Sequence, residues 1–252
     1  MGDPVVSGAP QGTPGLGLDP VVTRLLNHAD DNMVLAQRLG EWISNAPELE
    51  LDIAIGNIAL DHLGVARSLY THAGAVEGRG RTEDEFAMRR SEREFTNLLL
   101  VEQPNGDFAH TIVRQAFFDL YQQLLWADLA KDGDETLAGI AARAAKENAY
   151  HHEFSGNWLV RLGDGTEESH VRAQKAVDRL WMFTGEMFQH ETAGYRGRWE
   201  AAADDLLAEA TLTVPEDRYQ KSGGRVGFHT EHLGFLIAEM QWMQRSYPGM
   251  EW

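Results

Sequence analysis

Residues 146–169 decide the fold: Lys-Glu-Asn-Ala-Tyr-His-His-Glu-Phe-Ser-Gly-Asn-Trp-Leu-Val-Arg-Leu-Gly-Asp-Gly-Thr-Glu-Glu-Ser. The first half continues an alanine-rich segment and is typical of the middle of a long helix. Gly163 is predicted to end that helix in the left-handed conformation. Thr166 is predicted to cap the next helix, with Glu167 and Glu168 matching its positive end. The stretch therefore predicts two helices joined by a short turn.

Asn148 and His151 are three residues apart and share one helix face. A carboxylate at position 148 would complete the Glu-x-x-His element with which helical bundles hold a di-iron centre. This chain has an amide there. We therefore predict a bundle that has kept its shape and lost its metal.

The remaining chain also shows helical periodicity and lacks a strand pattern of useful length. Residues 1–19 are rich in Gly and Pro and are predicted to be a disordered tail. Residues 20–252 are predicted to be one all-α domain, an antiparallel helical bundle with additional helices. The helices are expected at 21–43, 48–73, 82 onward, 107–129, 135–162, 166–188, 199–210 and 228–245.

The amino-acid composition excludes several kinds of partner and binding site. The chain has 252 residues, a formal charge of −17 and no cysteine. So acidic a surface repels phosphate backbones, so we expect no nucleic-acid partner. The lack of cysteine excludes disulfides and thiolate metal sites. No apolar run is long enough to cross a bilayer, and the N-terminus lacks a signal-peptide pattern. We expect a cytoplasmic protein without a membrane partner.

The metal-ligand set is incomplete. A di-iron bundle needs carboxylates from two helices and Glu-x-x-His from two others. On the second long helix, Val65 follows His62 by three residues and cannot bind a metal. We therefore expect no catalytic residue and no cofactor in this chain. An alternative is a mononuclear site using Glu147, His151 and Asp61.

Four polar residues and Val65 occupy the positions where a metal centre of this kind would lie, and we call these positions the degenerate site. The four polar residues either form a buried hydrogen-bond network, or some of them face solvent. The sequence leaves both open. The four are Asn57, Asp61, Asn148 and His151.

Three other histidine patterns resemble metal motifs. Glu167 and His170 lie in the first turn after Thr166, where acids are expected for electrostatic reasons. Asp107 and His110 fit a helix cap in the same way. His229 and His232 are more consistent with capping and packing than with metal binding. None of the three patterns is assigned a metal.

The last predicted helix is apolar around most of its circumference. Such a helix is buried in a core or lies at a subunit interface. Core packing explains one face, and the remaining width indicates a protein partner. The interface candidates are Phe235, Trp242 and Met243.

Long segments of the chain resemble the C subunits of bacterial ring-1,2-phenylacetyl-CoA epoxidases, which are multicomponent oxygenases. The resemblance covers nearly everything after the N-terminal tail. Its most specific segments are residues 77–84, 98–115, 160–169, 211–217 and 229–234.

This resemblance implies a ferritin-like fold and a structural role without catalysis. In that family a related A subunit carries the di-iron site and binds phenylacetyl-CoA. The C subunit pairs with A, and further subunits, including a reductase, supply electrons from NADPH. The isolated chain could also form a homodimer. Asn148 and Val65 depart from the catalytic pattern, so the resemblance assigns no ligand residue here.

Overall fold

The computed structural model describes residues 18–216 and 219–250. In these residues it contains eight α-helices and no strand, which confirms the all-α prediction. No helix in this part of the chain is long and apolar enough to cross a membrane. The helices are α1 (Pro20–Glu41), α2 (Leu49–Glu77), α3 (Glu83–Met88), α4 (Phe108–Leu129), α5 (Glu135–Gly163), α6 (Glu167–Leu180), α7 (Arg196–Glu209) and α8 (Glu231–Ser246).

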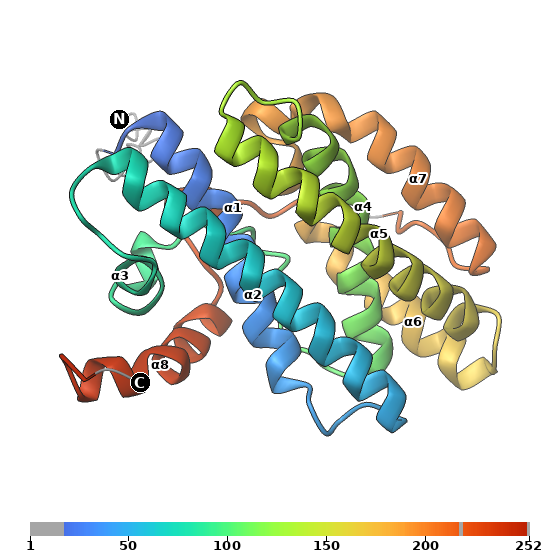
Figure 1. Cartoon of the computed structure of the whole chain (residues 1–252). Coiled ribbons are helices and arrows are strands. Elements are labelled where there is room, and N and C mark those ends of the chain that lie inside the picture. Colours follow the sequence, from blue (N-terminus) through green and yellow to red (C-terminus); the bar gives the residue numbers. More distant parts are fainter. Residues whose placement is uncertain (1–17, 217–218, 251–252) are drawn as a thin grey trace, which may run out of the picture.

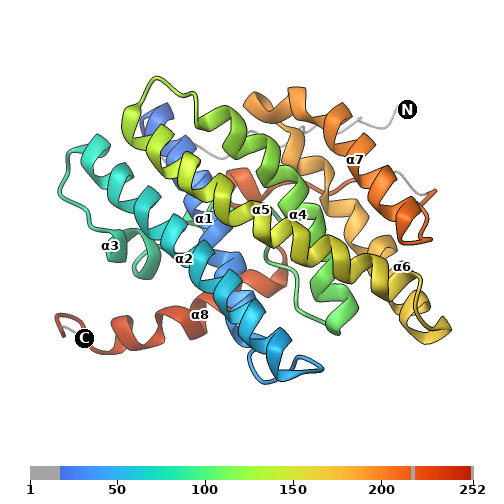
Figure 2. The ribbon, with the colours of Figure 1, turned by 45° about the vertical axis from the view of Figure 1, so that its right-hand side comes forward.

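Four long helices form the centre of the molecule. α1 packs along α2, α4 packs along α5, and α2 contacts α5 between the two pairs (Figure 1). This is the expected ferritin-like bundle. α6 and α7 cover α4 and α5, whereas α3 and α8 contact each other on the side of α1 and α2 (Figure 2). Polar side chains that point between the two helix pairs are therefore enclosed by α1, α2, α4 and α5.

Several predicted helix starts are confirmed by their caps. The Asp107 carboxylate accepts the backbone N–H of His110 at 2.9 Å. Thr82 and Thr166 each form a capping box at the start of their helices. Asp19, the last residue of the predicted tail, caps α1 by accepting the Val21 N–H at 2.8 Å. Residues 1–17 of that tail lie outside the described residues.

Four predicted helix bounds are wrong by three residues or more, and one of them is the start of α7, which lies at Arg196 and not at residue 199. α2 continues to Glu77 and ends only where Gly78 takes a left-handed φ of 68°. α6 ends at Leu180, and three short 3-10 helices follow it up to residue 195. There the Thr184 hydroxyl donates to the Trp181 carbonyl and so competes with helix continuation. α8 begins at Glu231, because the turn at Gly227 precedes it and leaves Phe228 outside the helix.

Gly163 is required for a reason other than the predicted one. It remains helical, and Asp164 follows it with an ordinary negative φ of −95°. A Cβ at position 163 would lie 1.9 Å from the carbonyl oxygen of Ala210. The glycine therefore allows the end of α5 to approach the end of α7.

An irregular segment, residues 95–103, crosses the interior beside α1 and is buried throughout. Buried backbone N–H groups need acceptors. Asp30 accepts from Thr96 N at 2.8 Å, Asp31 from Leu98 N at 2.7 Å and Glu186 from Leu99 N at 2.8 Å. Arg90 pairs with Asp30, and Arg225 pairs with Asp31. This segment precedes the predicted helix at 107–129, and nothing in the sequence indicates that it is buried and held by carboxylates.

Candidate functional site

A polar cluster lies where α2, α4 and α5 meet. His62 comes from α2, Asp119 from α4 and His151 from α5, and all three are buried. One nitrogen or oxygen atom of each lies within 4.8 Å of the others. Within the described residues, this is the one group of three such side chains close enough to hold a metal ion. We call it the central cluster.

Asp119 is fully enclosed, and both of its oxygens are used. Gln115 Nε2 donates to Oδ1 at 2.7 Å, and Ser155 Oγ donates to Oδ2 at 2.7 Å. Burial raises the pKa of Asp119 to about 6, although His151 and the two hydrogen bonds oppose the shift. The Asp119 carboxyl group therefore exchanges its proton near pH 6, just below neutral pH.

His62 is held as a neutral imidazole. Burial lowers its pKa well below the usual value, and the neighbouring His151 lowers it further. Its Nδ1 lies 2.7 Å from Asn32 Oδ1, which also accepts from Gln122 Nε2 at 3.0 Å. A carbonyl oxygen accepts only, so Nδ1 carries the proton. Nε2 is then free to accept from Gln115 Nε2, 3.3 Å away.

His151 links the cluster to the surface of α2. Its Nε2 lies 3.0 Å from Asp61 Oδ2, and its ring centroid is 5.0 Å from that of His62. Its Nδ1 is buried without a hydrogen-bond partner. His151 therefore has one ring nitrogen satisfied by a carboxylate and one available inside the bundle.

The structure brings some of the residues predicted for the degenerate site close to one another, but not all of them. Asn148 and His151 are buried, and Asp61 is half-buried against His151. Asn57 is exposed, so of the two alternatives left open by the sequence, the one in which some of the four face solvent holds for this residue. Val65 is buried among apolar side chains of the core.

Glu147 does not join His151 and Asp61 as the mononuclear alternative required. Its carboxylate instead accepts from Arg143 on the same helix at 2.8 Å. The three-donor group found in the structure contains His62 and Asp119 in place of Glu147 and Asp61. The α4 contribution was not predicted, although Gln115 and Asp119 stand four residues apart on a mostly apolar helix.

The residues do not fit a pair of iron ions. In Glu-x-x-His the carboxylate precedes the histidine, so the position to compare with Asn148 is Ala59, three residues before His62. Val65, three residues after His62, is therefore not the equivalent position, and the comparison made from the sequence was wrong. Ala59, Asn148 and Asn32 offer no negative charge, which leaves Asp119 as the buried carboxylate of the cluster. Two imidazoles and one carboxylate could at most hold a single divalent ion.

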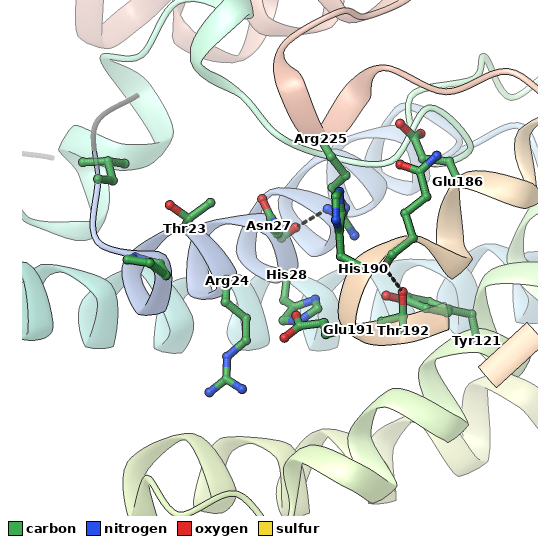
Figure 3. Close-up of a pocket in the computed structure, with 13 residues that line it drawn as sticks. Thr23, Arg24, Asn27, His28, Tyr121, Glu186, His190, Glu191, Thr192 and Arg225 are labelled. Atoms are coloured by element: carbon green, nitrogen blue, oxygen red, sulfur yellow. Dashed lines mark hydrogen bonds and ion pairs between the residues drawn. The ribbon is translucent and has the colours of Figure 1, made fainter. Parts of the chain in front are cut away.

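A separate cavity of about 460 Å³ lies beside α1, and none of these residues lines it (Figure 3). His28 Nε2 lies 3.6 Å from Glu191 Oε1 in its wall. Tyr121 contributes a buried hydroxyl without a hydrogen-bond partner, and burial raises its pKa. Arg24 adds a cation. Its residues include no group of three metal donors within the described chain, so the central cluster remains the candidate metal site.

The other histidine patterns have structural roles. His229 contacts Glu102 Oε2 through Nδ1 and the Phe95 carbonyl through Nε2, both at 2.8 Å. His170 Nδ1 lies 2.7 Å from the Gly163 carbonyl at the end of α5. These contacts agree with the capping and packing interpretation.

A ferritin-like helical bundle with a buried polar centre defines the class of protein. The chain belongs to the family of phenylacetic acid catabolic proteins, whose model matches residues 11–252. It is 46% identical over 241 residues to the C subunit of the 1,2-phenylacetyl-CoA epoxidase of Escherichia coli strain K12. That alignment covers 90% of this chain and 97% of the relative.

Proposed function

We propose that this chain is the non-catalytic structural subunit of a phenylacetyl-CoA epoxidase in aerobic phenylacetate breakdown. It pairs with a di-iron catalytic subunit and stabilises it, and a reductase subunit supplies electrons to that partner. The observation that carries the proposal is that Asp119 is the one carboxylate of the central cluster, beside two histidines. Two irons in a dry core need several anionic oxygens to balance their charge.

The hydrogen bonds of the cluster support the same proposal. Asn32, Gln115 and Gln122 satisfy the groups that in a metal centre would face the ions. His151 Nδ1, Asn148 Oδ1 and Gln115 Oε1 have no hydrogen-bond partner, so the network is only partly satisfied. Its paired groups still join α1, α2 and α4 through hydrogen bonds that need no metal.

Co-expression tests the proposal. The chain and a catalytic subunit of the same epoxidase should co-purify as a complex of defined mass, and the catalytic subunit alone should lose activity or solubility. Epoxidation by the catalytic subunit alone, at the rate of the complex, would refute the structural role.

A second candidate is a ferritin-like metalloprotein with its own single-ion site. The close approach of His62, Asp119 and His151 favours it, as does the unpartnered His151 Nδ1. An ionised carboxylate has about four lone-pair sites, so Asp119 can bind an ion while it accepts from Gln115 and Ser155. Metal analysis of protein purified without chelators separates the two: one tightly bound ion per chain, lost in His62→Ala, supports this candidate.

A further inference from the structure

The outer side of the α1–α2 pair carries a groove of about 590 Å³, which we call the α1–α2 groove. Leu49, Ile53 and Leu60 of α2 line it and are 70%, 56% and 64% exposed. Gly40 of α1 and Gly56 of α2 also line it, and a Cβ added at either would meet nothing within 4 Å. The groove therefore has apolar walls and open space above its glycines.

The spacing of these side chains fits a helix-binding surface. Leu49, Ile53 and Leu60 are four and seven residues apart, so they form one stripe along α2. Glycines between such side chains let a second helix approach closely. Single exposed leucines are ordinary, but a continuous apolar stripe beside an open groove marks an interaction site.

The groove itself contains one carboxylate, and that group is already bound. Asp52 accepts the backbone N–H groups of Ser44 at 2.7 Å and Ala46 at 3.1 Å, closing the α1–α2 turn. A partner seated in the groove therefore need not leave a charged group buried and unpaired.

Charges around the groove decide between a second copy and a different protein. Glu48 and Glu50 are exposed at the start of α2, and their carboxylates make no ion pair with any described residue. Farther along α2, the Arg67 guanidinium is already paired with Glu83 at 3.2 Å. A second copy, with its formal charge of −17, would offer these acids no free cation on this face.

We infer that the α1–α2 groove receives an apolar helix of the catalytic partner subunit, flanked by basic side chains that meet Glu48 and Glu50. This inference rests on the proposed function and names the surface that performs it. α2 carries His62 on its inner side, so the partner packs against the helix that holds part of the central cluster.

The test measures affinity for the catalytic subunit with three changes in full-length chain. Ile53→Asp and Leu60→Asp should each weaken binding at least about tenfold. Gly56→Leu should weaken it similarly by filling the groove, while its better helix propensity keeps or raises the melting temperature. Val171→Asp is the matched control, because Val171 is 55% exposed on α6, and it should leave the affinity unchanged.

The role of Glu48 and Glu50 is tested by a separate measurement. Glu48→Lys with Glu50→Lys should lower the affinity, and added salt should weaken wild-type binding more than it weakens this variant. Equal affinity of the wild type and all groove variants would overturn the inference. So would groove variants that change only the mass of the isolated chain in light scattering, because a second copy would then occupy the groove. Failure of the wild type to bind the catalytic subunit would refute the proposed function itself.

Discussion

The side-chain amide of Asn148 on α5 donates a hydrogen bond to the backbone carbonyl of Asp119 on α4 at 3.1 Å. The residue that stands where Glu-x-x-His would have its carboxylate thus ties two helices together as a neutral group. Its own Oδ1 is buried without a partner. The centre of the bundle uses this position for packing and hydrogen bonding.

Asn148→Glu should not create oxygenase activity. Ala59 and Asn32 still lack carboxylates, so one new acid beside Asp119 cannot balance two irons. Burying a second carboxylate there should lower the free energy of unfolding at pH 7.5 by about 3 kcal/mol. Denaturant titration and an assay with phenylacetyl-CoA check both parts, with Asn148→Ala as the control for loss of the hydrogen bond. Turnover by Asn148→Glu alone would contradict the account.

Asp119 should make the protein less stable as the pH rises from about 4 to 7. Its folded-state pKa is about 6, whereas an unfolded Asp titrates near 3.8, so the folded state binds the extra proton between these values. The difference of about two units corresponds to about 3 kcal/mol. In Asp119→Asn this loss should disappear.

Denaturant titrations of wild type and Asp119→Asn across this pH range measure the effect. The exposed Asp205 provides the control, because Asp205→Asn should follow the wild-type pH dependence. If the stability difference between wild type and Asp119→Asn stays constant with pH, the buried carboxyl group does not titrate as described.

His229 should stabilise the segment just before α8 most strongly in mild acid. Burial opposes protonation, but the Glu102 carboxylate and the Phe95 carbonyl outweigh it and raise the pKa of His229. Its stabilisation is therefore complete below about pH 6.5, the unfolded value, and is lost as the pH rises through the higher folded-state pKa. His229→Gln should cost about 2 kcal/mol at pH 6 and less at pH 9.

Thermal melts at both pH values test this interpretation. His232→Gln is the matched control, since the His232 side chain makes no hydrogen bond with the described residues. A larger loss for His229→Gln at pH 9 than at pH 6 would reverse the assigned sign.

Trp242→Ala should weaken binding to other epoxidase subunits more than it lowers the melting temperature. Trp242 is 59% exposed on α8, next to the exposed Phe235 and Met243 side chains predicted as interface candidates. Leu236→Ala on the same helix should do the opposite, because Leu236 is buried against the core. Pull-down and melting experiments on the two variants decide whether the outer face of α8 is an interface.

Local signals in the sequence predicted most of the fold. Asp107, Thr82 and Thr166 mark helix starts that the structure confirms, because a cap depends only on neighbouring residues. The end of α6 was missed because the Thr184 hydroxyl and residues far along the chain, such as Gln220, hold the following 3-10 turns. Such tertiary contacts leave no local pattern.

The central cluster was only half predictable. α2 carries apolar residues on both its inner side and its exposed side, as Ile58 and Leu60 illustrate. Periodicity therefore could not tell which face of α2 points inward, and the sequence left open whether Asn57 is buried or faces solvent. Asp119 was missed because its pairing with Ser155 and proximity to His62 depend on how α4 meets its neighbours.

The most direct test of the central claim is anaerobic loading of the isolated, full-length chain with Fe(II), followed by iron analysis and Mössbauer spectroscopy after exposure to O2. We predict that no coupled iron pair forms, since Asp119 is the only buried carboxylate among the described residues of the cluster. A spectrum showing two bridged irons per chain would contradict this prediction.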